Sequence, residues 1–230
     1  MLGISYVLHI PSSPFFATMQ ADSGTFAFTA ERMLDGDLLY RDVWDHKPPG
    51  VYWINALALS IGGATPWSIW WLSVVYVAAT SFVFFRLLSE LTSRRYAAVG
   101  AIILLVTILY PAFFQDGNFT EIYSLLPQLL IIICAYVYLR SLGKKWIISL
   151  GFLTVITALF KQTYIATGLA AVVVLAIFQW KTGRWRAVGN FIGSFLAGAA
   201  LPLVFILIYW GAKDALYEFI DAVFLYNFEY

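Results

Sequence analysis

One short string in this chain combines acidic and basic side chains at the edge of an apolar region. Acidic residues begin at Asp22, and the first acidic cluster ends in the string Asp45-His46-Lys47-Pro48-Pro49-Gly50. A lysine ammonium can offset the charge of a phosphate group, and a carboxylate can take a proton from a hydroxyl group. This combination indicates chemistry on a charged lipid at a membrane face.

Two further carboxylates, Asp116 and Glu121, enclose a short polar segment. If Asp22 and one of these acids converge over the same cleft, the pair could bind a divalent cation, or bind and deprotonate a sugar hydroxyl. The alternatives are that Asp22 is only a helix N-cap and that a solvated loop holds the other two acids. Asn118-Phe119-Thr120 also matches a glycosylation sequon, which matters only in a eukaryotic secretory pathway.

Two lysines are candidates for contact with an anionic substrate. Lys47 precedes two prolines and the apolar segment 50–61, so we expect it near the positive end of a helix, where a phosphate binds well. Lys161 lies between two apolar runs, and an ionisable group at such a depth is a functional candidate. The alternative for both is a lysine that snorkels to ordinary headgroups. Supporting candidates for substrate binding are Arg41, His46 and Tyr52.

The composition indicates that much of the chain lies within a membrane. Of the 230 residues, 61% are hydrophobic and 12% are charged, whereas soluble domains have roughly 45–50% apolar and about 25% charged residues. Crossing a bilayer takes roughly 20 apolar residues. We predict an all-α, polytopic transmembrane helical bundle. Its six spans are 66–85, 96–114, 122–139, 146–160, 164–180 and 187–210.

The charges predict the orientation of these spans. Segment 50–61 is too short to cross, so we expect it to lie along the interface with Tyr52 and Trp53 at headgroup level. Nine of the fourteen basic residues then share one side, joined only by Glu90 among the acids, and this side is cytoplasmic. Twelve of the thirteen carboxylates lie on the exterior face. A crossing 50–61 would move the first acidic region to the cytoplasm, which the charge rule disfavours only mildly.

The chain is predicted to be a single module, 1–230. We expect the end of a truncated first helix at 1–11, a first exterior loop at 12–65, the spans at 66–210 and an exterior amphipathic tail at 211–230. Asp22 and Ser23 are predicted to cap a helix that Asp35-Gly36-Asp37 ends. The predicted apolar face of this helix comprises Phe26, Ala30, Met33 and Leu34, and that of the tail Leu216, Phe219, Ile220, Val223 and Phe224.

Two smaller features concern packing. Gly189, Gly193 and Ala197 have small-xxx-small spacing, which permits close approach of two helices. Cys134 is the single cysteine, so a disulfide within the chain is excluded.

Taken together, the chain resembles the C-type membrane glycosyltransferase superfamily. It is most similar to the dolichyl-phosphate-mannose protein mannosyltransferase-like group, which includes bacterial aminoarabinose transferases. The resemblance covers nearly the whole chain from Ala21 onward. Its most specific part is Asp22, then Tyr40-Arg41-Asp42, then the run His46-Lys47-Pro48-Pro49-Gly50-Val51-Tyr52-Trp53-Ile54-Asn55.

The resemblance implies a transferase whose donor is a polyprenyl-phosphate-linked sugar that enters from the bilayer. The acceptor is a lipid, a glycan or a protein, and no nucleic acid is involved. Asp22 fits the acid that binds the acceptor and acts as base in an inverting transfer, and Lys47 fits the lysine on the phosphate. Asp116 or Glu121 fits the acid of the second exterior loop. No cofactor is required, although a divalent cation is possible. The expected location is the plasma membrane of a bacterial-type cell, with the active face exterior.

This chain departs from the family pattern in ways that limit the transfer of a substrate. Ser23 stands where the family often has Glu, and His46 stands where the aminoarabinose enzymes have an acid. The large C-terminal part of many members is absent. Two other functions stay open: a lipid or sugar transporter, and a non-catalytic partner of a split membrane enzyme. Transporters tend to carry charges at the midplane, whereas these gather at one surface, which favours an enzyme.

Overall fold

The computed structural model describes residues 1–110, 116–183 and 188–229, and it is helical. In these ranges we find no β-strand, only an isolated bridge between Leu39 and Val43. The predicted all-α class is therefore confirmed. The chain forms two compact units. Unit 1 comprises Met1–Trp44 and Pro49–Leu126, and unit 2 comprises Asp45–Pro48 and Pro127–Tyr230.

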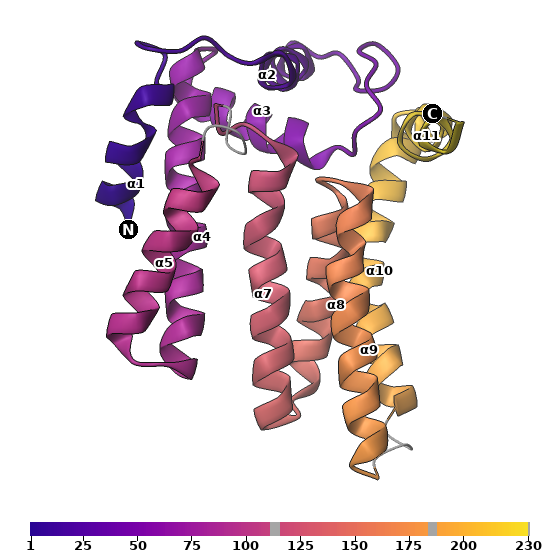
Figure 1. Cartoon of the computed structure of the whole chain (residues 1–230). Coiled ribbons are helices and arrows are strands. Elements are labelled where there is room, and N and C mark those ends of the chain that lie inside the picture. Colours follow the sequence, from indigo (N-terminus) through magenta and orange to yellow (C-terminus); the bar gives the residue numbers. More distant parts are fainter. Residues whose placement is uncertain (111–115, 184–187, 230) are drawn as a thin grey trace. The chain divides into compact units, whose positions relative to one another are not determined.

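In unit 1, a helical hairpin carries two shorter helices across one of its ends (Figure 1). The hairpin pairs α4 with α5, α1 packs along α4, and α2 packs on α3. Pro66 stands in the first turn of α4, where its missing N–H has no partner to lose. The bounds are α1 (Leu2–His9), η1 (Ile10–Ser12), α2 (Ala21–Leu34), α3 (Gly50–Gly62), α4 (Pro66–Leu91) and α5 (Arg94–Ile108).

In unit 2, helices α8, α9 and α10 pack together, and short helices follow α10 (Figure 1). α7 (Thr120–Ser141) begins in unit 1 and contributes its later turns to unit 2. The core is formed by large apolar side chains such as Ile131, Leu150, Leu175 and Phe195. The other bounds are α8 (Lys144–Ala158), η2 (Gln162–Tyr164), α9 (Ile165–Lys181), α10 (Val188–Ala212), α11 (Leu216–Ile220), the π-helical turn η4 (Asp221–Leu225) and α12 (Tyr226–Glu229).

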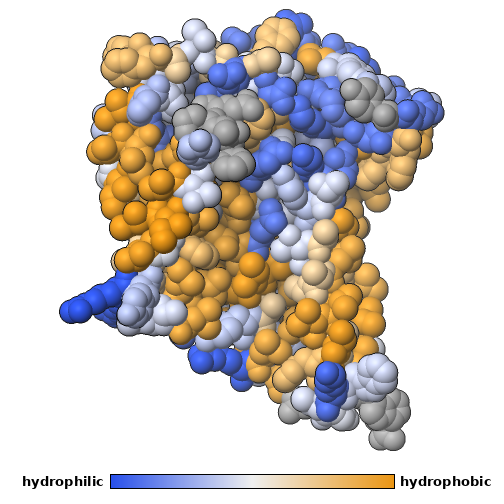
Figure 2. Space-filling model, in the orientation of Figure 1, coloured by the Kyte–Doolittle hydropathy of each residue, from blue (hydrophilic) through white to orange (hydrophobic). Residues whose placement is uncertain are grey.

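Four of the six predicted spans correspond to helices that are long and apolar enough to cross a membrane: Pro66–Leu91, Thr120–Ser141, Gln162–Lys181 and Val188–Ala212. Apolar side chains cover the visible flanks of the helices (Figure 2). The chain is thus an integral membrane protein. The predicted spans 96–114 and 146–160 appear as the 15-residue helices α5 and α8. Residues 111–114 of the first, Gln115, Arg184, Arg186 and Ala187 lie outside the described residues.

The start of α2 differs from its prediction. The N-cap is Gln20, whereas Asp22 lies in the first turn and Ser23 is buried. No side-chain hydrogen bond caps this helix. An acidic residue in the first turn still complements the positive end of the helix dipole. The predicted end at Asp35 is confirmed, and Gly36 follows with φ of 108°. Phe26 and Ala30 are buried as predicted, but Leu34 is 49% exposed.

Different glycines from those predicted bring helices of unit 2 together. A Cβ atom at Gly198 would collide with the backbone of Ile148 on α8, and one at Gly151 would collide with the backbone of Phe195 on α10. In contrast, no atom lies within 4 Å of a Cβ built at Gly189 or Gly193. The small-residue spacing therefore exists in the sequence, but close contact occurs through a neighbouring face of α10.

The two ends of the chain are also more structured than their predictions. In α1, the Ser5 hydroxyl donates to the Val74 carbonyl at 2.9 Å, and the Trp70 indole donates to the His9 carbonyl at 3.1 Å. The tail is not one continuous amphipathic helix, because the π-helical turn η4 interrupts it. Phe219 and Val223 are buried as the pattern predicts, whereas Phe224 is 45% exposed because the interruption shifts the helical face.

Candidate functional site

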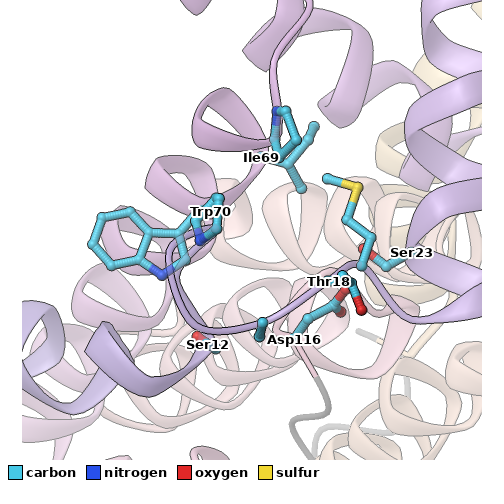
Figure 3. A pocket seen from close by; sticks show the side chains of 10 residues that line it. Ser12, Thr18, Ser23, Ile69, Trp70 and Asp116 are labelled. Atoms are coloured by element: carbon cyan, nitrogen blue, oxygen red, sulfur yellow. The ribbon is translucent and has the colours of Figure 1, made fainter.

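A cavity of about 350 Å³ opens in unit 1 beside the start of α2. It is formed by the segment that leads into α2, by the first turns of α4 and by Asp116. Pockets for small ligands commonly have volumes of roughly 300–1,000 Å³, with mostly apolar walls and a few polar groups. Figure 3 shows the oxygen-bearing side chains of Thr18, Ser23 and Asp116 together, with Trp70 and Ile69 on other sides of the cavity.

Asp116 ties the loop before α7 to the start of α2. Its Oδ2 atom accepts a hydrogen bond of 2.9 Å from the backbone N–H of Gln20, two residues before Asp22. The N-terminal N–H groups of a helix and its flank require such acceptors. Asp116 therefore positions the end of the helix that carries Asp22 and also faces the cavity.

The other two acids of the prediction lie elsewhere in unit 1. Asp22 is exposed in the first turn of α2 and is not part of the cavity wall, although its neighbour Ser23 is. Glu121 lies in the first turn of α7, where its carboxylate accepts a hydrogen bond of 2.8 Å from the Thr120 hydroxyl. The structure thus brings Asp116, and not Glu121, to the cavity beside α2.

Ser23 presents a buried polar atom to this cavity. The residue is fully buried, and its hydroxyl has no hydrogen-bond partner among the described residues. A buried hydroxyl without a partner is costly, so a polar ligand in the cavity would find an available donor and acceptor there. Sequence reasoning treated Ser23 only as a helix cap and missed this role.

A buried pair of asparagines lies next to the cavity and holds the backbone of Ser23. Each side-chain amide of Asn55 and Asn118 donates to the side-chain oxygen of the other at 2.9 Å. Asn118 also donates to the Ser23 carbonyl at 3.2 Å and accepts from the Tyr123 hydroxyl at 2.9 Å. Asn118 is fully buried, so its sequon has a packing role in this fold and offers no surface for a glycan. The signal for this network was the polar Asn55 within an apolar helix.

Arg41 is engaged in the turn that follows α2. Its guanidinium donates to both carboxylate oxygens of Asp42 at 3.1 Å, and Asp42 also accepts from the Leu38 backbone N–H at 2.8 Å. These hydrogen bonds, first from Arg41 and then from Leu38, hold the pKa of the Asp42 carboxyl below its ordinary value of 3.8. Arg41 therefore shapes this turn, and its contact with a substrate stays a prediction.

The string that contains Lys47 is shaped by Asp45 in unit 2. Asp45 is 7% exposed, and its Oδ1 atom accepts from the backbone N–H of His46 at 2.6 Å and from that of Lys47 at 3.3 Å. The His46 ring lies 5.6 Å from the ring of Tyr226, and the His46 carbonyl accepts a 3.0 Å hydrogen bond from the Asn227 amide. The tail thus helps to hold this string, and Lys47 is half-buried within it.

Tyr52 and Lys161 complete the predicted set of substrate-binding residues. Tyr52 is fully buried and packs edge-on against Phe26 at 5.8 Å, so its ring is covered by protein and is not exposed to lipid headgroups. The physical reason is that the α2–α3 contact needs a large apolar ring. Lys161 is exposed at the turn between α8 and α9, with its Nζ atom 5.8 Å from the Tyr164 ring. Gln162, the next residue, donates to the Val223 carbonyl of the tail at 2.7 Å.

The described residues contain no group of three or more His, Cys, Asp or Glu side chains arranged to hold a metal ion. A divalent cation would therefore rest on fewer protein ligands, and it stays an untested prediction.

Comparison with known families supplies the identification. The model of the dolichyl-phosphate-mannose-protein mannosyltransferase family matches residues 46–210. The chain belongs to this family. It is therefore a membrane glycosyltransferase by family. Neither a search of curated proteins nor a search of solved structures found a match.

The matched segment divides the candidate residues into two groups. It begins at His46, directly before Lys47, and it also contains Asp116, Glu121 and Lys161. Asp22 and Arg41 lie outside it. The roles expected for these two residues therefore rest on the residue pattern of the first segment and on the geometry at the start of α2.

Proposed function

We propose that this protein transfers a sugar from a polyprenyl-phosphate-linked donor to a hydroxyl group of an acceptor at the exterior face of the plasma membrane. The family match over residues 46–210 supports this proposal, because the family is named for a dolichyl-phosphate-mannose donor. Membrane-spanning helices suit the lipid tail of such a donor, and the Lys47 ammonium suits its phosphate.

The reaction needs one bond formed and one broken at the sugar C1 atom. The acceptor oxygen attacks C1, the bond from C1 to the phosphate oxygen breaks, and the polyprenyl phosphate leaves with the electron pair. Attack from the face opposite the leaving group inverts the configuration. The proton of the acceptor hydroxyl goes to a carboxylate, and the charge that develops on the phosphate needs a cation.

We assign Asp22 as the base and Lys47 as the ligand of the donor phosphate. Asp22 is exposed in the first turn of α2, and α2 is anchored at Gln20 by Asp116. The cavity beside Ser23 would hold part of the acceptor, whose hydroxyl groups match the hydroxyl of Ser23 and the carboxylate of Asp116. His46, Arg41 and Lys161 are supporting residues in this proposal.

The test is sugar transfer by the purified chain in lipid vesicles with a radiolabelled polyprenyl-phosphate sugar. Asp22→Asn keeps the size of the side chain and removes its basicity, so transfer should be lost while circular dichroism stays unchanged. Lys47→Ala should weaken donor binding. Asp35→Asn, which makes the same change at the other end of α2, serves as the control. Retained transfer in Asp22→Asn would remove Asp22 as the base.

A further inference from the structure

A second cavity, of about 380 Å³, lies wholly within unit 2 and is unrelated to the residues assigned above. It is located where α7 ends, α8 begins and α9 approaches α10, at the end of the unit away from the tail (Figure 1). Its polar lining comes from Lys144, Gln179, Tyr138, Asn190 and Ser194. Apolar side chains, including Phe191, supply the remainder. This mixture fits a ligand with a charged head and an apolar body.

Gln179 carries the strongest sign that the cavity takes a ligand. The residue is 2% exposed and lines the cavity. Its Nε2 atom donates to the Tyr138 hydroxyl, but its Oε1 atom has no hydrogen-bond partner among the described residues. A buried amide oxygen without a donor costs free energy that a native fold normally avoids. A ligand hydroxyl would satisfy this oxygen.

The charge at this end of the unit favours an anion. Between Glu121 and Asp214 the chain contains no acidic residue, and Arg140, Lys144, Lys145 and Lys181 belong to the helix ends on this side of the unit. Lys144 and Lys145 both stand in the first turn of α8, where the helix dipole adds further positive potential and no acid is present. Cations are unfavourable at that position unless an anion balances them.

The neighbouring basic residues differ in their surroundings. The Nζ atom of Lys145 lies 5.2 Å from the centre of the Trp146 ring, and the Arg140 guanidinium lies 4.8 Å from that of Tyr136. Cation–π contacts of this kind partly satisfy a basic group. Lys144 instead lines the cavity. The geometry therefore singles out Lys144 as the cation that meets a ligand there.

We propose that this cavity binds the headgroup of an anionic phospholipid that carries free hydroxyl groups, such as phosphatidylglycerol. Lys144 contacts the phosphate, and Gln179 Oε1 accepts a hydrogen bond from a headgroup hydroxyl. The acyl chains run along the apolar flanks of the helices. Basic pockets between membrane helices are suited to such headgroups, particularly on the cytoplasmic side where anionic lipids concentrate. The site does not depend on the proposed transferase reaction.

The test is lipid binding to the purified full chain, measured by native mass spectrometry. The probes are phosphatidylglycerol, phosphatidic acid, which has the phosphate without the glycerol hydroxyls, and phosphatidylcholine, which has no net charge. Phosphatidylglycerol should bind best and phosphatidylcholine least. Lys144→Gln should weaken phosphatidylglycerol binding about fivefold. Lys145→Gln, the same change one residue away, should leave it unaltered.

The role of Gln179 has its own variants. Gln179→Leu should reduce phosphatidylglycerol binding to the level of phosphatidic acid and leave phosphatidic acid binding unchanged. If that variant does not fold, Gln179→Glu has nearly the same shape. Its carboxylate should weaken the binding of both lipids, because it repels their phosphates. Equal loss in Lys144→Gln and Lys145→Gln would overturn the proposal, since it would indicate diffuse surface charge. Displacement of the lipid by glycerol 3-phosphate alone would overturn the lipid assignment in favour of a soluble phosphate ester.

Discussion

Asp116 connects the loop before α7 with the helix that carries Asp22. Asp116 accepts the Gln20 N–H and lines the cavity, whereas Glu121 binds the adjacent Thr120 hydroxyl. These two acids were indistinguishable in the sequence, because both lie in one polar stretch of seven residues, 115–121. Their different hydrogen-bond partners now assign them different roles.

We predict that Asp116→Ala lowers sugar transfer about tenfold or more, because small displacements of reacting groups carry large rate costs. Asp116→Asn should restore part of the rate, since an amide oxygen can still accept the Gln20 N–H. Glu121→Ala serves as the matched control and should leave transfer within about twofold, because Glu121 does not line the cavity and accepts a hydrogen bond from the adjacent Thr120. Kinetic measurement of transfer in vesicles checks this, and an equal loss in both alanine variants would contradict it.

The turn around Asp42 should depend on pH. The pKa of Asp42 is lower in the folded protein than its ordinary value of 3.8, so its stabilisation of the turn is present above that value. It is lost as the pH falls through the lowered folded pKa. Hydrogen exchange of residues 38–43 should therefore accelerate only in strong acid. Asp42→Asn should flatten this acid dependence, whereas Asp35→Asn should leave it unchanged; the same acid profile in Asp42→Asn would show that another group is responsible.

At the scale of the elements, the close contact between α8 and α10 depends on two glycines. Gly198 faces the α8 backbone and Gly151 faces the α10 backbone, with no room for a Cβ atom at either position. Gly193 lies on the same helix as Gly198 but faces open space. Substitutions at Gly198 and at Gly193 can therefore be compared to separate the effect of packing from that of helix propensity.

We expect Gly198→Val to lower the free energy of unfolding by about 1–3 kcal/mol, or to separate α8 from α10, because the added methyl groups overpack a backbone contact. Gly193→Val makes the same change in propensity at an open position and should have a much smaller effect. Thermal unfolding of both variants in detergent gives the comparison. Similar losses in the two variants would mean that propensity, rather than helix packing, decides the stability.

Periodicity predicted the elements better than it predicted their contacts. The apolar runs correctly indicated the long helices, and the short run after Pro49 became the 13-residue helix α3. The N-cap at Asp22 was wrong, because Gln20 holds that position and Asp116, distant in sequence, binds its N–H. Which glycines form a helix contact likewise depends on the rotation of each helix about its axis. Spacing alone does not determine that rotation.

The candidate site was predictable only in part for the same reason. Residue types indicated Lys47 and the acids near α2 as candidates, since a phosphate needs a cation and an acceptor hydroxyl needs a base. The buried Asn55–Asn118 pair and the orphan hydroxyl of Ser23 depend on contacts between segments far apart in the chain. Asn118 carried a surface motif, and only its burial shows that packing decides its role.

At the scale of the whole molecule, the distribution of charge matches an enzyme that works at one membrane face. In unit 2, Arg140, Lys144, Lys145 and Lys181 lie at the turns that join α7 to α8 and at the end of α9. The acids of the same unit are Asp45 and the acidic residues of the tail after α10. The positive-inside rule predicts that the basic end faces the cytoplasm, and the proposed function uses this orientation.

The most direct test of the central claim is the choice of donor. The purified chain in vesicles is given the same radiolabelled sugar either on a polyprenyl phosphate or on a nucleoside diphosphate, with Lys47→Ala alongside. We predict product or donor hydrolysis from the lipid-linked sugar alone, and its loss in the variant. Turnover of the nucleotide sugar, or movement of the lipid-linked sugar across the bilayer without any product, would contradict the account.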